Sequence, residues 1–283
     1  PPRSTLFPYT TLFRSKALGN LNIKDGAQVN LAYTTNVLNT NVENGGTLGL
    51  NVSAYNVLSG GAFNLFENGT IDWGTNGRMT VYGTANFNKA TGSNATNKLV
   101  ADGGTLNYNY TDQTASESVT LKNGATLNVN GTANFGGLKS EKSDASAGNS
   151  VLNVAGTLAQ VDFIDSLVKD LTLTGAGKVL AVSSVNLDAS SKIDGLNEMQ
   201  LQSNLTLNGN EHSLNTLLFT NGGSSLTLND DAVLNVYDRI SFYTDDGYVK
   251  GDGTLRAKSG ANFSVHTGTV NGNYLKNLHI EKG

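Results

Sequence analysis

The chain has 283 residues and a formal net charge of -4, with 33 glycines, three prolines, 37 asparagines and no cysteine. The absence of cysteine excludes a disulfide framework, thiol chemistry and Cys-based zinc sites. Lys and Arg residues are few, so the chain lacks the basic surface that is typical of a nucleic-acid-binding protein. The sequence contains no run of about 18 apolar residues, so it predicts no transmembrane helix.

The first fifteen residues differ in composition from the rest of the chain. They hold all three prolines, and residues 5–15 read TLFPYTTLFRS. This stretch resembles the translation of a sequencing adapter, and Pro8 and Arg14 interrupt any apolar run that a secretory signal would need. We therefore expect residues 1–15 to be a non-native, disordered leader. Residues 16–283 are expected to form a single domain whose native N-terminus is missing.

After the leader, Asn-Gly and Asp-Gly dipeptides mark tight turns, because Gly, and less readily Asn and Asp, accept a positive φ. Intervals of 19 to 25 residues separate the members of two such series, which are Asp25, Asn44 and Asn68, and Asn221, Asp246 and Asn271. An apolar–polar–apolar triplet follows the turns at Asp25, Asn44, Asp102, Asn123 and Asn221, as at residues 106–108 and 127–129. This alternation predicts half-buried strands, and the period of about 19–26 residues is typical of a solenoid.

Two architectures use such a pattern. An antiparallel meander would use Asn-Gly as hairpin turns, with a turn every 8–12 residues or so. A parallel β-helix would stack one coil per repeat, in constant register, and would exclude proline from its strands. The longer period, the constant register and the lack of proline after Pro8 favour the β-helix. At roughly 22 residues per coil, we expect an all-β solenoid of about twelve coils.

Four segments depart from the repeat. The polar stretches at residues 91–98, 111–118 and 138–150 predict loops between coils. Residues 160–170, QVDFIDSLVKD, have apolar side chains at helical spacing. We expect this segment to form one helical turn or a loop packed on the rod.

The repeated units resemble those of an autotransporter passenger domain of the self-associating adhesin type. The resemblance rests on residues 103–107, 123–129 and 156–158, with weaker copies over most of residues 19–283. It implies a right-handed parallel β-helix, at the cell surface or secreted through the outer membrane of a Gram-negative-type bacterium. It also implies that the chain is a fragment, and that a C-terminal β-barrel missing from it anchors the protein.

Catalytic and metal-binding motifs are absent from the sequence. His212, His266 and His279 do not cluster, and we expect all three to be solvated or to lie in turns. No nucleophile elbow, phosphate-binding loop or calcium-binding nonapeptide is present. We therefore expect no catalytic residue, no metal and no cofactor.

One enzymatic alternative is polysaccharide cleavage, because β-helical lyases, glycosidases and tail spikes use carboxylates on one face of such a rod. Glycosidases need two carboxyl groups about 5–10 Å apart. The candidates here, with Arg239 as a nearby anion partner, are Asp230, Asp231, Asp238, Asp245 and Asp246. The simpler interpretation is that these aspartates form polar turns.

Tyrosines in two regions are candidates for a sugar-stacking or partner-binding patch. They are Tyr237, Tyr243 and Tyr248 in one region, and Tyr108 and Tyr110 in the other. Tyr108 is expected to face the core.

The sequence therefore predicts a non-enzymatic rod that acts in adhesion or self-association, through outward rows of Asn, Thr and Ser. Its partners would be another copy of the chain, or a host or matrix glycan or protein. A passive spacer is a further interpretation that the sequence does not separate from an adhesin.

Overall fold

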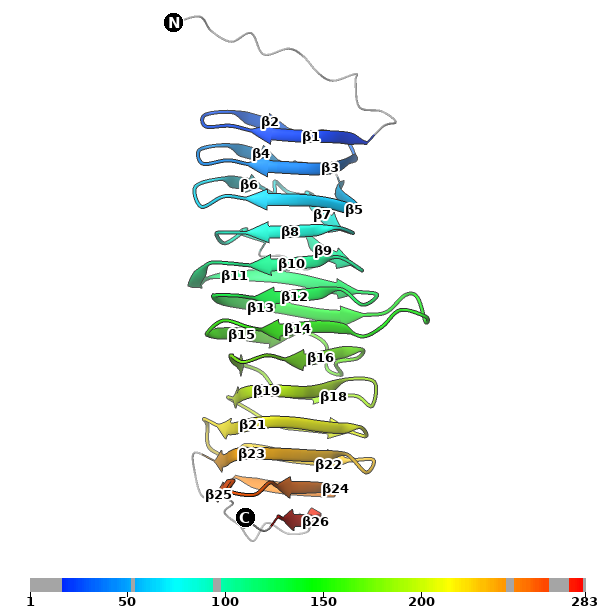
Figure 1. Ribbon diagram of the computed structural model, residues 1–283, viewed down its shortest axis with the longest axis vertical. Helices are drawn as coiled ribbons and strands as arrows, with labels where there is room; N and C mark the ends of the chain where they lie inside the picture. The colour runs from blue at the N-terminus through cyan, green and yellow to red at the C-terminus, as the bar shows by residue number, and fades with distance from the viewer. Residues whose placement is uncertain (1–16, 52–53, 94–97, 243–246, 265–274, 282–283) are drawn as a thin grey trace, which may run out of the picture.

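The computed structural model describes residues 17–51, 54–93, 98–242, 247–264 and 275–281, so the leader at residues 1–15 lies outside it. The chain forms a β-solenoid of about eleven turns, close to the dozen expected. The strand pairings are parallel, and no helix occurs in the described residues. The predicted parallel β-helix is confirmed. The strands nearest the viewer in Figure 1 run from right to left while the chain descends behind them, which is a right-handed sense.

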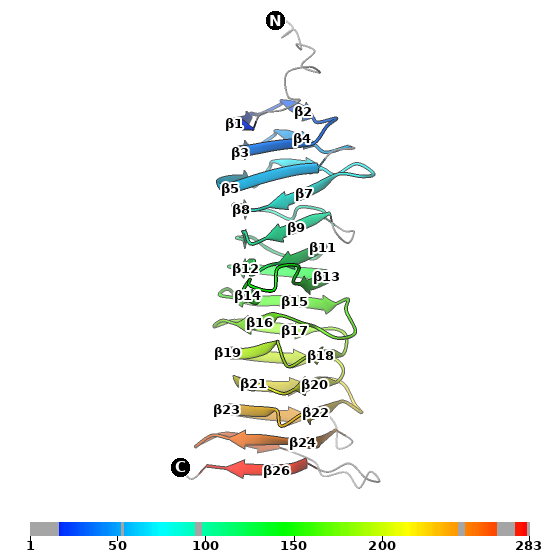
Figure 2. The ribbon, with the colours of Figure 1, turned by 90° about the vertical axis from the view of Figure 1, so that its right-hand side faces the viewer.

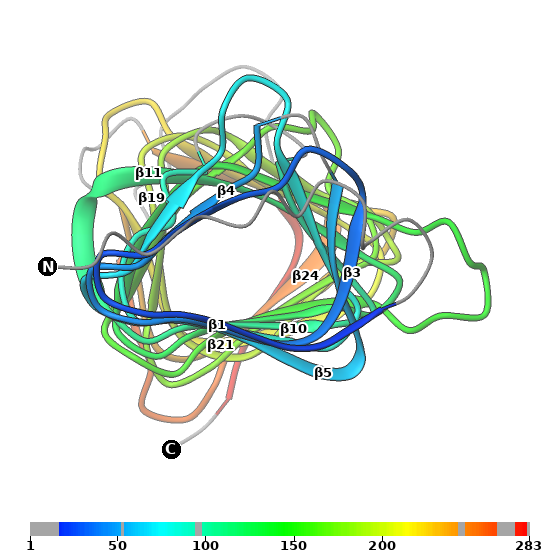
Figure 3. The same ribbon diagram turned by 90° about the horizontal axis from the view of Figure 1, so that it is seen from above.

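Three faces surround the core, and Figure 3 shows the front strands superimposed along one straight wall. The front face, nearest the viewer in Figure 1, contains β1 (Leu18–Ile23), β8 (Thr84–Phe87), β10 (Thr105–Tyr108), β12 (Thr126–Val129), β14 (Ser150–Val154), β16 (Leu171–Thr174) and β26 (Leu275–Ile280). The second face contains β2 (Gln28–Asn30), β4 (Thr47–Gly49), β6 (Thr70–Asp72), β15 (Leu158–Phe163), β17 (Lys178–Ala181) and β25 (Asn262–Ser264). The third face contains β7 (Arg78–Val81), β9 (Leu99–Asp102), β18 (Val185–Leu187), β20 (Leu205–Asn208) and β22 (Ser225–Asn229).

Longer strands bend around a corner and belong to two faces. Those that run from the third face onto the front face are β3 (Thr35–Val42), β5 (Ala54–Leu65) and β24 (Tyr248–Ala257). Those that run from the second face onto the third are β11 (Thr111–Lys122) and β13 (Thr132–Glu141). Those that run from the front face onto the second are β19 (Lys192–Leu201), β21 (Glu211–Phe219) and β23 (Val233–Phe242). Register shifts mark several of these bends, as between Val37 and Asn39 of β3.

The turns stack in close register along the whole rod (Figure 2). Hydrogen-bonded asparagines in successive turns of the front face are separated by 19 residues near the N-terminus and by as many as 25 farther along. This agrees with the period predicted from the Asn-Gly and Asp-Gly spacing. The turn residues Asn123, Asp230 and Asp231 have positive φ values of 52°, 52° and 57°.

Inward side chains from the three faces fill a continuous core. A row of aromatic rings runs through its N-terminal part, with centroids 5.9 Å apart for Phe63 and Phe87 and 5.1 Å apart for Phe87 and Tyr108. Tyr108 is fully buried, as predicted. Each buried side chain of this size contributes roughly 1.5–3 kcal/mol. A single turn cannot bury its own apolar face, so stability comes from the stacking of neighbours.

Two of the predicted loops are correct only in part. The loop after β13 covers residues 142–149 and projects from the rod (Figures 1 and 3), but residues 138–141 belong to β13. In the stretch at residues 91–98, the described residues 91–93 and 98 form no strand.

Of the two other predictions about the irregular segments, the first is wrong and the second is correct only in part, since residues 164–170 form a loop in which Val168 is buried. Residues 111–118, predicted to be a loop, lie within β11, because the chain stays paired with β13 around the corner, with register shifts between Thr111 and Ser116 and between Glu117 and Ser118. The helical spacing at residues 160–170 does not produce a helix. Residues 160–163 belong to β15, and Val168 forms a parallel bridge with Leu187. The stacking of neighbouring turns overrides the local periodicity there.

Candidate functional surfaces

The front face carries a regular, uncharged array that we call the Thr/Asn platform. It consists of three outward positions in each of three successive turns, namely Thr84, Asn86 and Asn88, then Thr105, Asn107 and Asn109, then Thr126, Asn128 and Asn130. The strands β8, β10 and β12 hold the first two columns in exact alignment through their parallel register. Most of these side chains are half-buried, and Asn109 and Asn130 are exposed. The platform therefore repeats one polar pattern at the strand spacing of about 4.8 Å.

The middle column of the platform belongs to a longer amide ladder. Each Nδ2 donates to the Oδ1 of the asparagine one turn before it, over distances of 2.7 to 2.9 Å. The members of this ladder are Asn22, Asn41, Asn64, Asn86, Asn107, Asn128 and Asn153. The third column is bonded in the same way, from Asn109 to Asn88 at 3.2 Å and from Asn130 to Asn109 at 2.8 Å.

The ladder uses only part of each amide's hydrogen-bonding capacity. An asparagine side chain has two N–H donors and two oxygen lone pairs. An interior member such as Asn107 uses one donor toward Asn86 and one lone pair toward Asn128. The ladder bonds therefore do not use one N–H donor and one oxygen lone pair of each interior asparagine. These groups recur at a fixed spacing along the face. The platform is thus a preorganised row of alternating donors and acceptors.

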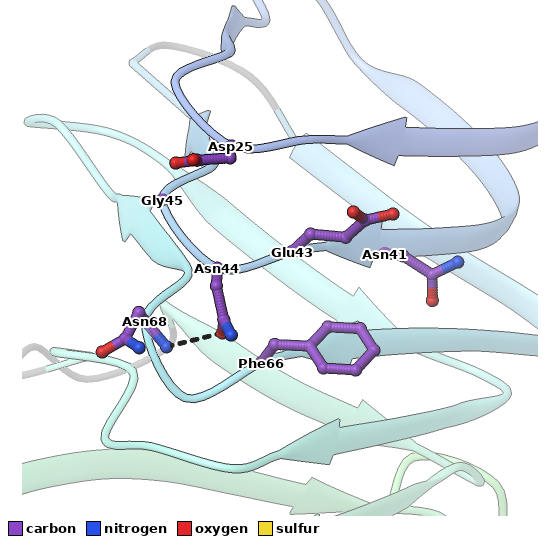
Figure 4. A pocket seen from close by; sticks show the side chains of 7 residues that line it. All are labelled: Asp25, Asn41, Glu43, Asn44, Gly45, Phe66 and Asn68. Atoms are coloured by element: carbon purple, nitrogen blue, oxygen red, sulfur yellow. Dashed lines mark hydrogen bonds between the residues drawn. The ribbon is translucent and has the colours of Figure 1, made fainter.

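A hollow of about 700 Å³ lies at the corner between the front and second faces, near the N-terminal end of the described rod (Figure 4). The turns after β1, β3 and β5 form it. Its lining residues are Asp25, Asn41, Glu43, Asn44, Gly45, Phe66 and Asn68. Sequence reasoning used Asp25, Asn44 and Asn68 only as turn markers. It missed the hollow because stacking the three turns brings these side chains together.

The described carboxylates considered for polysaccharide cleavage lie at two places in the fold. Asp230 and Asp231 form the exposed turn before β23, whereas Asp238 lies in the middle of β23, beyond its front-face segment. Asp231 precedes the front-face segment of β23 and Asp238 follows it, seven residues later in the chain. Asp238 accepts a hydrogen bond from the Thr216 hydroxyl at 2.9 Å. Asp245 and Asp246 lie outside the described residues.

The tyrosines predicted to form a patch do not gather either. Tyr237 is exposed at the corner between the front and second faces. Tyr248 lies in the third-face part of β24, where the Lys250 ammonium is 5.5 Å from its ring centroid. Tyr243 lies outside the described residues. In the other candidate region, Tyr110 is buried together with Tyr108, so neither ring is free to stack on a sugar.

The prediction that all three histidines are solvated or in turns is wrong for His212. Its side chain is fully buried, because β21 directs it into the core. The backbone N–H of Ile193 donates to Nδ1 at 3.2 Å, and Nε2 lies 3.1 Å from the carbonyl oxygen of Gly209. These contacts fit a neutral imidazole with its hydrogen on Nε2. Burial lowers the pKa of His212 below the ordinary 6.5. His279 is exposed, and His266 lies outside the described residues.

Glu117 is a buried carboxylate that the sequence did not single out. It is fully inaccessible and accepts hydrogen bonds from the backbone N–H groups of Thr91, Gly92 and Ser93, at 2.5 to 3.2 Å. The hydroxyls of Thr91 and Tyr110 also donate to it. Burial and the nearby carboxylate raise the pKa of Tyr110. Glu117 therefore fixes the backbone of residues 91–93 against the rod.

The described residues contain no group of three or more His, Asp and Glu side chains arranged to hold a metal ion. No helix able to cross a membrane occurs in the part of the chain that the structure covers. Comparison of the chain with protein-family models, with curated proteins and with solved structures gives no match.

Proposed function

We propose that this chain is a β-helical segment of a bacterial surface or secreted protein, of the autotransporter passenger type, that acts in adhesion or self-association. The observation that carries the proposal is the Thr/Asn platform. Its nine positions are uncharged, and it presents regularly spaced donors and acceptors on a straight wall.

The platform suits a contact between two copies of the chain. Because each unit presents both donors and acceptors, an identical platform turned by a two-fold axis is its complement. The absence of charge in the array removes the like-charge repulsion that two identical faces would otherwise meet. The ladder also fixes the side chains in advance, which lowers the entropy lost on association.

A test uses the chain displayed on the surface of a bacterium that does not clump by itself. Thr105→Lys places a charge in the middle of the platform, where two copies would face one another. Thr206→Lys is the matched control, since Thr206 is also a half-buried threonine in a strand, but on the third face. We expect clumping with the unchanged chain and with Thr206→Lys, and a several-fold decrease with Thr105→Lys. Absence of clumping together with absence of binding to cells, matrix or glycans would contradict the proposal.

Among the described candidate carboxylates of the polysaccharide-cleaving alternative, Asp230 and Asp231 share one turn, and Asp238 lies beyond the front-face segment of β23. The adhesive function is favoured because the platform is a regular surface within the described residues.

A further inference from the structure

The hollow at the corner of the N-terminal turns contains one aromatic ring that the fold does not require. Phe66 follows β5 directly, and its backbone N–H donates to the carbonyl oxygen of Val42. The equivalent N–H groups of the next turns belong to Asn88, Asn109 and Asn130. The position that Phe66 occupies is therefore polar in the turns farther along the rod, and the side chains there point away from the core. Phe66 is 40% exposed.

Polar side chains from two neighbouring turns surround this ring. Glu43 occupies the same position of the preceding turn as Phe66 and pairs with Lys24 at 3.5 Å, with the Lys24 side chain 74% exposed and the Glu43 side chain 39% exposed. Asn44 reaches from its own turn to the next, where its Oδ1 accepts the backbone N–H of Asn68 at 3.1 Å (Figure 4). That bond fixes the orientation of the Asn44 amide and does not use its two N–H groups.

Gly45 gives the hollow its shape at the opposite end. It has a φ of +76°, and a Cβ at this position would lie 1.9 Å from Oδ1 of Asp25. Only a glycine lets the Asp25 side chain lie against the turn of residues 43–46. The lining thus combines one apolar ring face, two carboxylates and several amides, and Lys24, which is not a lining residue, offsets one of the two negative charges through its pair with Glu43.

This combination matches the chemistry of a saccharide. A pyranose presents a C–H face that packs on an aromatic ring, and hydroxyls that both donate and accept hydrogen bonds. Carboxylates accept hydroxyl hydrogens strongly, whereas they repel uronate and sulfate groups. We propose that the hollow is a binding subsite for an uncharged glycan, which stacks on Phe66 and donates hydroxyl hydrogens to Glu43. This inference rests on the proposed adhesive function and names its ligand class.

The test measures binding of cellohexaose, maltohexaose and chitohexaose to the purified chain by calorimetry and saturation-transfer NMR, with tri-galacturonate as the charged comparison. Phe66→Ala is expected to weaken binding of the preferred neutral oligosaccharide at least about tenfold. Tyr82→Ala is the matched control, because Tyr82 is 43% exposed in the following turn but outside the hollow. Glu43→Gln should weaken binding less than Phe66→Ala, and circular dichroism checks that all variants fold.

The inference is overturned if none of the three neutral oligosaccharides binds at millimolar concentration, or if Phe66→Ala and Tyr82→Ala bind alike. It is also overturned if tri-galacturonate binds more tightly than the neutral oligosaccharides. A Phe66→Ala variant that loses clumping while glycan binding is unchanged would assign the hollow to contact between copies. The platform variants Thr105→Lys and Thr206→Lys test self-association separately, so the two proposals can fail independently.

Discussion

The N-terminal region, residues 18–154, and the C-terminal region, residues 171–281, have the same fold but different front faces. In the N-terminal region the amide ladder runs without interruption to Asn153. The next register partner is Thr174, and there the series of asparagines ends. The column in the C-terminal region continues as Asp194, Ser213, Asn235, Arg256 and His279.

This difference shows what a ladder requires. A coil needs only an apolar residue facing inward to stack, so the outward position tolerates Asn, Asp, Ser or Arg alike. An amide ladder needs Asn at the same register position in every turn, and one substitution ends it. In the C-terminal region Asn208 and Asn229 share a register position on the third face and form one such bond, and Asn208 also donates to Asn186, which lies two positions out of register. The uninterrupted ladder is therefore a property of the N-terminal region.

The largest effect that we predict concerns Glu117, the buried anchor of the N-terminal region. Glu117→Ala should destabilise the chain by about 3–5 kcal/mol, because three backbone N–H groups lose their buried acceptor. Denaturant unfolding measures the change. In the C-terminal region, Glu198 pairs with Lys178 at 3.3 Å nearer the surface. Glu198→Ala should cost about 1 kcal/mol or less. Equal losses in the two variants would refute the distinction.

A ladder variant should have an intermediate effect. Asn107→Ala removes two ladder bonds and should cost about 1–3 kcal/mol, whereas Asn215→Ala removes the single bond to Asn197 and should cost about 0.5–1.5 kcal/mol. Extending the ladder sharpens the comparison further. Thr174→Asn should add one bond to Asn153 and stabilise the chain by roughly 0.5–1 kcal/mol. Thermal unfolding of the variants gives the order of their stabilities. A Thr174→Asn variant less stable than the unchanged chain would show that the ladder cannot be extended.

The last predicted effect is a pH dependence located in the C-terminal region. The pKa of His212 is lower in the folded chain than the ordinary 6.5, so the unfolded state binds the additional proton. Stability that is complete above pH 6.5 should therefore decrease as the pH falls below it, by at most about 1.4 kcal/mol per pH unit.

Hydrogen exchange between pH 7 and pH 5, corrected for intrinsic rates, measures this dependence by region. As the pH falls from 7 to 5, the protection of backbone amides against exchange should decrease more near Ile193 and His212 than in β10 and β12. His212→Gln should remove the difference between the regions. If the two regions respond equally in the unchanged chain, His212 does not control the acid sensitivity.

The sequence by itself determined the repeat, its period and the inward and outward positions. Stacked strands at a period of about two dozen residues leave one consistent register, because a shift by one residue would expose Leu106, Leu127 and their equivalents. The Asn-Gly turns and the absence of proline after Pro8 pointed to the same parallel fold.

Only the tertiary structure decided how residues from different turns meet. The strands at residues 111–118 and 160–163 both follow from pairing with neighbouring turns, which local pattern does not record. The burial of His212 and Glu117 depends in the same way on contacts 19 to 26 residues distant along the chain. The hollow around Phe66 exists because three turns stack, so no single repeat contains it.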